Sequence, residues 1–126
     1  MSYRILIVDD EPNIVLSLEY LMKKEGFEVL TAVNGEEALR LVERDQPDLI
    51  LLDIMIPKLD GYEVCQSVRA DPNCDGIRII MLTAKGRAVE REKGLALGAD
   101  AYISKPFSTR EVVEKVRSIL EEKPTT

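Results

Sequence analysis

Short apolar runs alternate with longer stretches of mixed polar and apolar residues along the 126-residue chain. The runs, rich in Ile, Leu and Val, are residues 5–8, 29–33, 49–52, 79–82 and 101–103. Nearly continuous apolar runs are typical of parallel strands that helices cover on both faces. The pattern therefore predicts five strands of one parallel sheet.

Each run is followed by a stretch whose apolar residues recur at helical spacing. In the first, Ile14, Leu18 and Met22 share a face, Pro12 stands at the start and Gly26 is a suitable stop. The other helices are expected after Asn34-Gly35, after Asp60-Gly61, from about Arg87 to Leu97 with an interruption at Gly94, and around Val112, Val116 and Ile119. Five β–α repeats predict an α/β fold, a five-stranded parallel sheet with five helices on both faces. We expect one domain over residues 1–122 and a flexible tail or linker stub over 123–126.

Composition and charge narrow the possible chemistry. The chain has 17 Lys and Arg against 23 Asp and Glu, a formal charge of −6, no His and two Cys. Without His, a Ser–His–Asp or Cys–His nucleophile cannot be built, and the acidic balance argues against direct nucleic-acid binding. Cys65 and Cys74 are expected to be unpaired thiols. The start of the chain lacks a signal-peptide pattern and no apolar stretch is long enough for membrane insertion, so we expect a cytoplasmic location.

Polar side chains follow four of the predicted strands. Asp9 and Asp10 end the first strand, Asp53 the third, Thr83 the fourth and Lys105 the fifth. Each has an ordinary explanation on its own: Asp10, for example, would favour the positive start of the next helix. Parallel sheets bind ligands at the carboxyl ends of their strands, near the switch in strand order. If the first and third strands are neighbours, the three carboxylates converge there.

Converging carboxylates call for a cation. Two carboxylates about 4 Å apart repel by about 4 kcal/mol at an effective dielectric constant of about 20. Oxygen ligands without His or Cys suit Mg²⁺, which commonly shares its coordination shell with a phosphate. A hydroxyl at Thr83 and a cation at Lys105 would fit a bound phosphoryl group. Together these residues predict phosphoryl chemistry with an aspartate nucleophile.

Five segments around these positions resemble the receiver domain of two-component response regulators. They are IVDDEP at 7–12, DLILLDIMIP at 48–57, DG at 60–61, MLTA at 81–84 and YISKPF at 102–107. The resemblance covers essentially the whole chain and implies the flavodoxin-like strand order 2-1-3-4-5.

The resemblance also implies roles for the site residues. Asp53 would accept a phosphoryl group from a phosphohistidine on a sensor histidine kinase or a histidine phosphotransfer protein. Asp10 and Asp53 would hold Mg²⁺ directly, Asp9 mainly through water, and Met55 through its backbone carbonyl. Lys105 would neutralise phosphoryl oxygens. Such a chain is not an enzyme in its own right, although it assists its own phosphorylation and slow self-dephosphorylation.

A conformational switch is implied in the same way. Thr83 would hydrogen-bond to the phosphoryl group, and Tyr102 would turn from an exposed to a buried position. The Lys105–Pro106 peptide bond is expected to be cis. The fourth helix, fifth strand and fifth helix would bind a downstream protein, and the chain would be a monomer or a phosphorylation-dependent dimer.

Two further hypotheses concern the surface and the lifetime of the phosphoryl group. Leu16 and Tyr20, four residues apart on the first helix and off its core face, are expected to contribute to kinase docking, against the alternative of chance surface residues. Met55 and Lys85, two residues after Asp53 and Thr83, carry no carboxylate or amide to orient water. Self-dephosphorylation is therefore expected to be slow.

Other classes fit less well. A haloacid dehalogenase would need a second Asp at Met55, a flavodoxin would need a Ser- and Gly-rich loop after the first strand, and a P-loop NTPase would need its glycine-rich motif. One alternative stays open: the chain is the receiver of a longer regulator with a DNA-binding or enzymatic effector.

Overall fold

The computed structural model describes residues 3–84 and 88–121. Its five parallel strands form one sheet in the order β2-β1-β3-β4-β5, which confirms the expected order. The strands are β1 (Arg4–Val8), β2 (Glu28–Ala32), β3 (Leu49–Asp53), β4 (Arg78–Ala84) and β5 (Ala101–Lys105). The helices are α1 (Pro12–Lys24), α2 (Gly35–Asp45), α3 (Gly61–Ala70), α4 (Ala88–Ala96) and α5 (Thr109–Glu121), with a short 3₁₀ helix at Pro72–Cys74.

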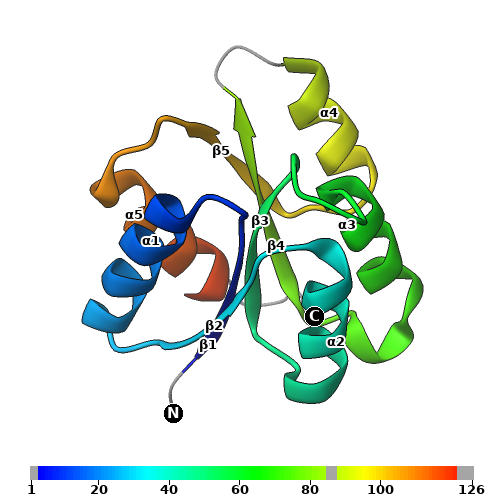
Figure 1. Ribbon diagram of the computed structural model, residues 1–126, viewed down its shortest axis with the longest axis horizontal. Helices are drawn as coiled ribbons and strands as arrows, with labels where there is room; N and C mark the ends of the chain where they lie inside the picture. Colours follow the sequence, from blue (N-terminus) through cyan, green and yellow to red (C-terminus); the bar gives the residue numbers. More distant parts are fainter. Residues whose placement is uncertain (1–2, 85–87, 122–126) are drawn as a thin grey trace.

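Helices cover both faces of the sheet. α1 and α5 lie on one face, and α2, α3 and α4 lie on the other (Figure 1). Alternate residues of a strand point to opposite faces, so Ile5 and Ile7 pack with α1 and α5 while Leu6 and Val8 pack on the other side. All four are fully buried, and this explains why the sequences of central strands such as β1 and β3 are apolar rather than alternating.

Capping residues fix where α2 and α3 begin, next to the carboxyl edge of the sheet. The Asn34 side chain accepts a hydrogen bond from the Glu37 N–H and caps α2, while Asp60 and Glu63 form a capping box at α3. A Cβ atom at Gly61 would lie 2.6 Å from the Asp53 carbonyl oxygen. Glycine there lets α3 begin directly against the end of β3, which holds the segment after Asp53 in place.

The structure corrects several details of the sequence prediction. β2 ends at Ala32, and Val33 is 52% exposed because it lies beyond the strand. Gly94 does not interrupt α4; it is buried, and a Cβ there would lie 3.2 Å from Met81 Cγ, so a small residue allows the helix to approach β4. The expected start of the fourth helix at Arg87 and the tail over 123–126 lie outside the described residues.

The described part of the chain contains neither a disulfide bond nor a membrane-spanning helix. Cys65 and Cys74 are both buried and form no disulfide bond. Among residues 3–84 and 88–121, no helix combines the length and the hydropathy that crossing a bilayer requires.

Candidate functional site

Three carboxylates meet at the carboxyl edge of the sheet. β1 and β3 are paired in register, with Val8 beside Leu52, so the residues that follow each strand are neighbours. One oxygen from each of Asp9, Asp10 and Asp53 lies within 4.8 Å of the others. Asp9 is fully buried, Asp53 is 7% exposed and Asp10 is exposed. The cluster is therefore partly shielded from water but open on the side of Asp10.

Lys105 reaches this cluster from β5. Its Nζ donates a hydrogen bond to Asp9 Oδ2 at 2.8 Å and lies 3.5 Å from Asp53 Oδ2. The Lys105–Pro106 peptide bond is cis, as predicted. Lys105 thus links two of the three carboxylates.

Burial and the charges in this cluster shift two pKa values. Burial and then the negative charge of Asp9 raise the pKa of Asp53 to about 6, although Lys105 opposes them. Burial alone would lower the pKa of Lys105, but the hydrogen bond to Asp9 and the charges of both aspartates outweigh it and raise that pKa. The raised pKa of Asp53 reflects its burial first and the charge of Asp9 second, so a cation bound beside it would favour the ionised carboxylate.

Backbone donors orient the two buried carboxylates. Asp53 Oδ1 accepts a hydrogen bond from the Met55 N–H at 3.3 Å, and Asp9 Oδ1 accepts one from the Glu11 N–H at 3.0 Å. The Met55 side chain is 75% exposed and lines the cleft beside Asp53, while its backbone N–H holds the carboxylate. Three carboxylates, with oxygen donors and neither His nor Cys, fit a hard divalent cation such as Mg²⁺.

Thr83 lies one strand away from Asp53, on β4. Its Oγ1 is the buried side-chain polar atom that lacks a hydrogen-bond partner within the described residues. An unpaired buried hydroxyl is costly and uncommon. The Thr83 hydroxyl is therefore able to donate a hydrogen bond to a ligand bound at this edge of the sheet.

Tyr102 differs from the expectation of an exposed ring. It is partly buried against the core cluster on the α4 side of the sheet, and the Arg91 guanidinium carbon lies 5.1 Å above its ring centre. The contact with α4 explains the burial. The sequence pattern alone carries no sign of that contact, because the two residues lie on different elements.

The other residues predicted from the sequence are Leu16 and Tyr20, on α1, and Lys85. Leu16 and Tyr20 are 63% and 68% exposed on α1. Their side chains are thus available to a partner, as the docking hypothesis requires. Lys85 lies outside the described residues.

A cleft of about 460 Å³ joins the carboxylates to neighbours that sequence reasoning missed. Besides Asp10, Asp53 and Lys105, it is lined by Glu11 and Ile14 near the start of α1 and by Glu90 of α4. The Glu90 carboxylate accepts a hydrogen bond from the Ala84 N–H at 3.3 Å. Glu90 resembles any exposed helix residue in the sequence, so no local signal could have identified it.

Comparison with known proteins agrees with this site. A family model described as the response regulator receiver domain matches residues 5–117. The alkaline phosphatase synthesis transcriptional regulatory protein PhoP of Bacillus subtilis is 50% identical over 120 residues, which are 95% of this chain and 49% of that protein. The chain spans about half the length of the curated relatives it matches.

Solved structures share the whole fold. A Chloroflexus aurantiacus protein assigned as a response regulator aligns with a TM-score of 0.93 and 37% identity over 97% of this chain and 100% of that one. The receiver domain of the sensor histidine kinase PA1611 from Pseudomonas aeruginosa, with magnesium coordinated in its active-site cleft, aligns with a TM-score of 0.88 and 32% identity, over 97% and 100%. The match along the sequence and the shared sheet order lead to one conclusion: this chain belongs to the response regulator receiver domain family.

Proposed function

We propose that this receiver accepts a phosphoryl group on Asp53 from a phosphohistidine of a sensor histidine kinase or a histidine phosphotransfer protein. The observation that carries the proposal is the convergence of Asp53, the Lys105 ammonium and the unpaired Thr83 hydroxyl at one edge of the sheet. The His-free composition agrees with it, because the imidazole then belongs to the partner.

The transfer uses this chain's residues in distinct ways. A carboxylate oxygen of Asp53 attacks phosphorus, the P–N bond of the phosphohistidine breaks, and its electron pair remains on the partner's imidazole. The Lys105 ammonium balances charge on the phosphoryl oxygens, and the Met55 N–H keeps the Asp53 carboxylate oriented. The Thr83 hydroxyl then donates a hydrogen bond to the bound phosphoryl group. The chain is an acceptor rather than an enzyme acting on another substrate.

Mg²⁺ is the cation that the donor set fits. We expect Asp10 and Asp53 to hold it directly, Asp9 to act mainly through water, and the Met55 carbonyl to complete the protein ligands. When bound, the ion would supply positive charge for the phosphoryl oxygens. The magnesium in the cleft of the Pseudomonas receiver supports this assignment.

The Asp53 carboxyl should make the stability of the metal-free chain depend on pH. Its folded pKa of about 6 lies above its unfolded value, so its contribution is complete below about pH 4 and is lost as the pH rises through 6. The loss is about 3 kcal/mol of unfolding free energy. Urea unfolding with EDTA at pH 4 and pH 8 should therefore show Asp53→Ala gaining stability relative to wild type at the higher pH. A difference that is independent of pH would contradict the shifted pKa, and Asp75→Ala is a matched control on an exposed Asp.

The bound phosphoryl group is proposed to drive a switch through Thr83 and Tyr102. Movement of Thr83 toward the group would leave room into which the half-buried Tyr102 ring turns fully. Raising the active state from about 1% to about 99% requires about 5.5 kcal/mol of differential stabilisation. The face formed by α4, β5 and α5 would then bind a downstream protein or a second copy of the chain.

Leu16 and Tyr20 are proposed to form part of the kinase-docking surface. Both side chains are more than half exposed on α1, whose N-terminal end borders the site. Leu16→Ala with Tyr20→Ala should slow phosphotransfer from the cognate kinase at least about tenfold and leave labelling by acetyl phosphate unchanged. Val33→Ala, another exposed apolar truncation, is the matched control. A double variant that is phosphorylated by the kinase at the wild-type rate would remove these residues from the docking surface.

The phosphoryl group on Asp53 is expected to be long-lived. Met55, whose exposed thioether stands two residues after Asp53, cannot orient a water molecule as a carboxylate or amide would. Met55→Asn should therefore accelerate dephosphorylation in the absence of a phosphatase, measured by intact-mass spectrometry over time. Loss of wild-type phosphoryl within seconds would contradict a slow reaction.

A second candidate concerns the context of the domain. Because the matched part of the Bacillus subtilis relative is 49% of a transcriptional regulatory protein, we also propose that this receiver controls a DNA-binding effector in a longer protein. DNA contacts would then lie in the effector, consistent with the acidic charge of this chain. Both candidates imply a cytoplasmic protein. The phosphoryl acceptance that both candidates require is tested by Mg²⁺-dependent labelling by acetyl phosphate in wild type and Asp53→Ala.

A further inference from the structure

Glu90 connects the first turn of α4 to the end of β4. Its carboxylate accepts the hydrogen bond from the backbone N–H of Ala84, the residue next to Thr83. Glu90 and Ala84 line the same cleft as Asp53 and Lys105. A negatively charged side chain of α4 therefore already takes a backbone donor at the edge of the site.

Few apolar contacts hold α4 in place. Among the residues Ala88–Ala96, only Gly94 is buried, while Val89 and Leu95 are 76% and 44% exposed. A helix with so little buried apolar surface lies toward the low-stability end of a fold. Its position therefore depends on polar contacts more than the positions of α3 and α5 do.

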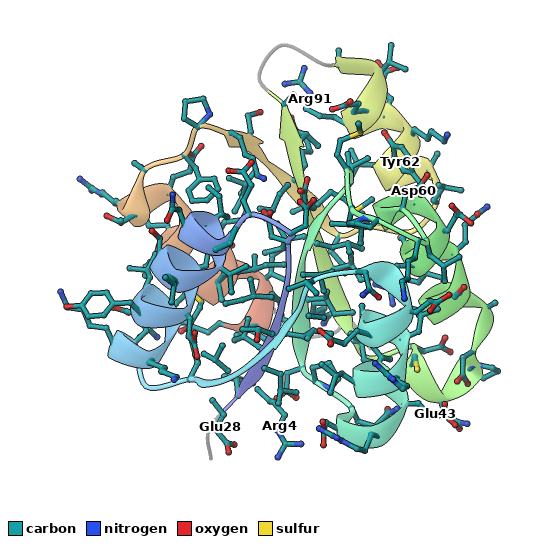
Figure 2. The ribbon with its side chains drawn as sticks, in the orientation of Figure 1. Arg4, Glu28, Glu43, Asp60, Tyr62 and Arg91 are labelled. Atoms are coloured by element: carbon teal, nitrogen blue, oxygen red, sulfur yellow. The ribbon has the colours of Figure 1, made fainter. Side chains whose placement is uncertain are left out.

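Two tyrosines supply further contacts of this kind. The Tyr62 hydroxyl of α3 donates to the Glu90 carbonyl oxygen at 3.4 Å, and Lys93 Nζ lies 4.3 Å above the Tyr62 ring. Arg91 stands over Tyr102 on the β5 side. Figure 2 shows Tyr62 close to α4 and Arg91 near its first turn. Each contact is weak at a partly exposed site, so α4 can shift without exposing a large core.

An anion on Asp53 would compete with Glu90 for the Ala84 N–H. A phosphoryl group adds close to two negative charges and three strong acceptor oxygens. Phosphoryl oxygens form short, charge-assisted bonds with backbone N–H groups, whereas the present bond of 3.3 Å is long for N–H···O. The cleft already carries Asp10, Asp53 and Glu11, so added charge would also repel the Glu90 carboxylate.

We propose that Glu90 occupies, in the unphosphorylated chain, a backbone donor that a phosphoryl group on Asp53 takes over. Phosphorylation then displaces Glu90 and releases the first turn of α4 from the end of β4. Glu90 is a positioning residue: it holds α4 in the resting arrangement. This inference rests on the proposed phosphorylation of Asp53, and it identifies the side chain through which that event reaches α4.

The test compares Glu90→Ala and Glu90→Gln with Glu92→Ala, which removes the same charge from an exposed position two residues further along α4. The first readout is the amide NMR resonance of Ala84 without phosphorylation. It should move in Glu90→Ala, move less in Glu90→Gln, which keeps an acceptor oxygen, and stay in place in Glu92→Ala. The second readout is the rate of Mg²⁺-dependent labelling by acetyl phosphate, which should rise at least about fivefold in Glu90→Ala, rise less in Glu90→Gln, and stay unchanged in Glu92→Ala.

Two outcomes would overturn the inference. One is equal labelling rates and equal Ala84 resonances in Glu90→Ala and Glu92→Ala. The other is a wild-type protein that becomes phosphorylated while its α4 amide resonances stay unchanged. If Glu90→Ala does not fold, Glu90→Gln carries the comparison. Absence of any labelling in wild type would instead overturn the proposed function, and the inference with it.

Discussion

Asp53→Ala is expected to abolish incorporation of a phosphoryl group from acetyl phosphate. The other carboxylates near the site are poorly suited to replace it: Asp9 is fully buried against Lys105, and Asp10 lies at the exposed rim. Asp53 alone is in contact with Lys105 and is also accessible from the cleft. Intact-mass spectrometry of wild type with acetyl phosphate and Mg²⁺ should show one added phosphoryl group, and the variant should show none.

The control for this experiment removes a carboxylate elsewhere. Asp75 is exposed just after the 3₁₀ helix, and Asp75→Ala should be labelled at the wild-type rate. Labelling of wild type should also stop when EDTA removes Mg²⁺. Persistent labelling in Asp53→Ala would mean that another side chain is the acceptor, and the proposed chemistry would be wrong.

Lys105→Met is expected to cause the largest loss of stability at the site. Without the ammonium, the fully buried Asp9 carboxylate loses its 2.8 Å ion pair and Asp53 loses its nearest cation. Breaking a buried ion pair by removing one partner costs about 3 kcal/mol or more. Urea unfolding at pH 8 with EDTA should show this loss, and phosphorylation by acetyl phosphate should slow as well.

Added Mg²⁺, a lower pH and a control lysine variant distinguish loss of the Lys105 ion pairs from a general loss of stability. Adding Mg²⁺ should return part of the stability, because the same carboxylates are proposed to bind it, and lowering the pH to 5 should also reduce the loss as Asp53 takes up a proton. Lys23→Met breaks an exposed pair with Glu19 on α1. That change should cost less than about 1 kcal/mol. Equal losses in the two lysine variants would argue against a special role for Lys105.

The centre of the sheet could be predicted because strands β1, β3 and β4 are buried on both faces. Ile5 to Val8 have no exposed surface, so every position is apolar and the strand stands out in the sequence. The cap residues Asn34 and Asp60 likewise act through their own helix, and their roles follow from local hydrogen bonding. The strand order came from the family resemblance rather than from the pattern, because apolar runs do not identify their neighbours.

Interactions between distant elements were the ones that could not be predicted. Gly94 is expected to weaken a helix when it is considered alone, but the close approach of Met81 makes it suitable. Tyr102 is half-buried because it packs against the core on the α4 side of the sheet, with Arg91 over its ring, and Glu90 reaches the cleft because α4 packs beside β4. Each of these depends on where α4 packs, and that is decided by weak contacts with other elements.

By itself, the sequence determined the α/β class and the polar residues at the carboxyl ends of four of the five strands: Asp9, Asp10, Asp53, Thr83 and Lys105. Those properties follow from the order of apolar and polar residues along the chain, which is local. The tertiary structure decided which of these groups touch, that Lys105 pairs most closely with Asp9, and that Glu90 takes the Ala84 N–H. Such contacts join residues from different strands and helices, so the packing of the sheet and its helices selects them.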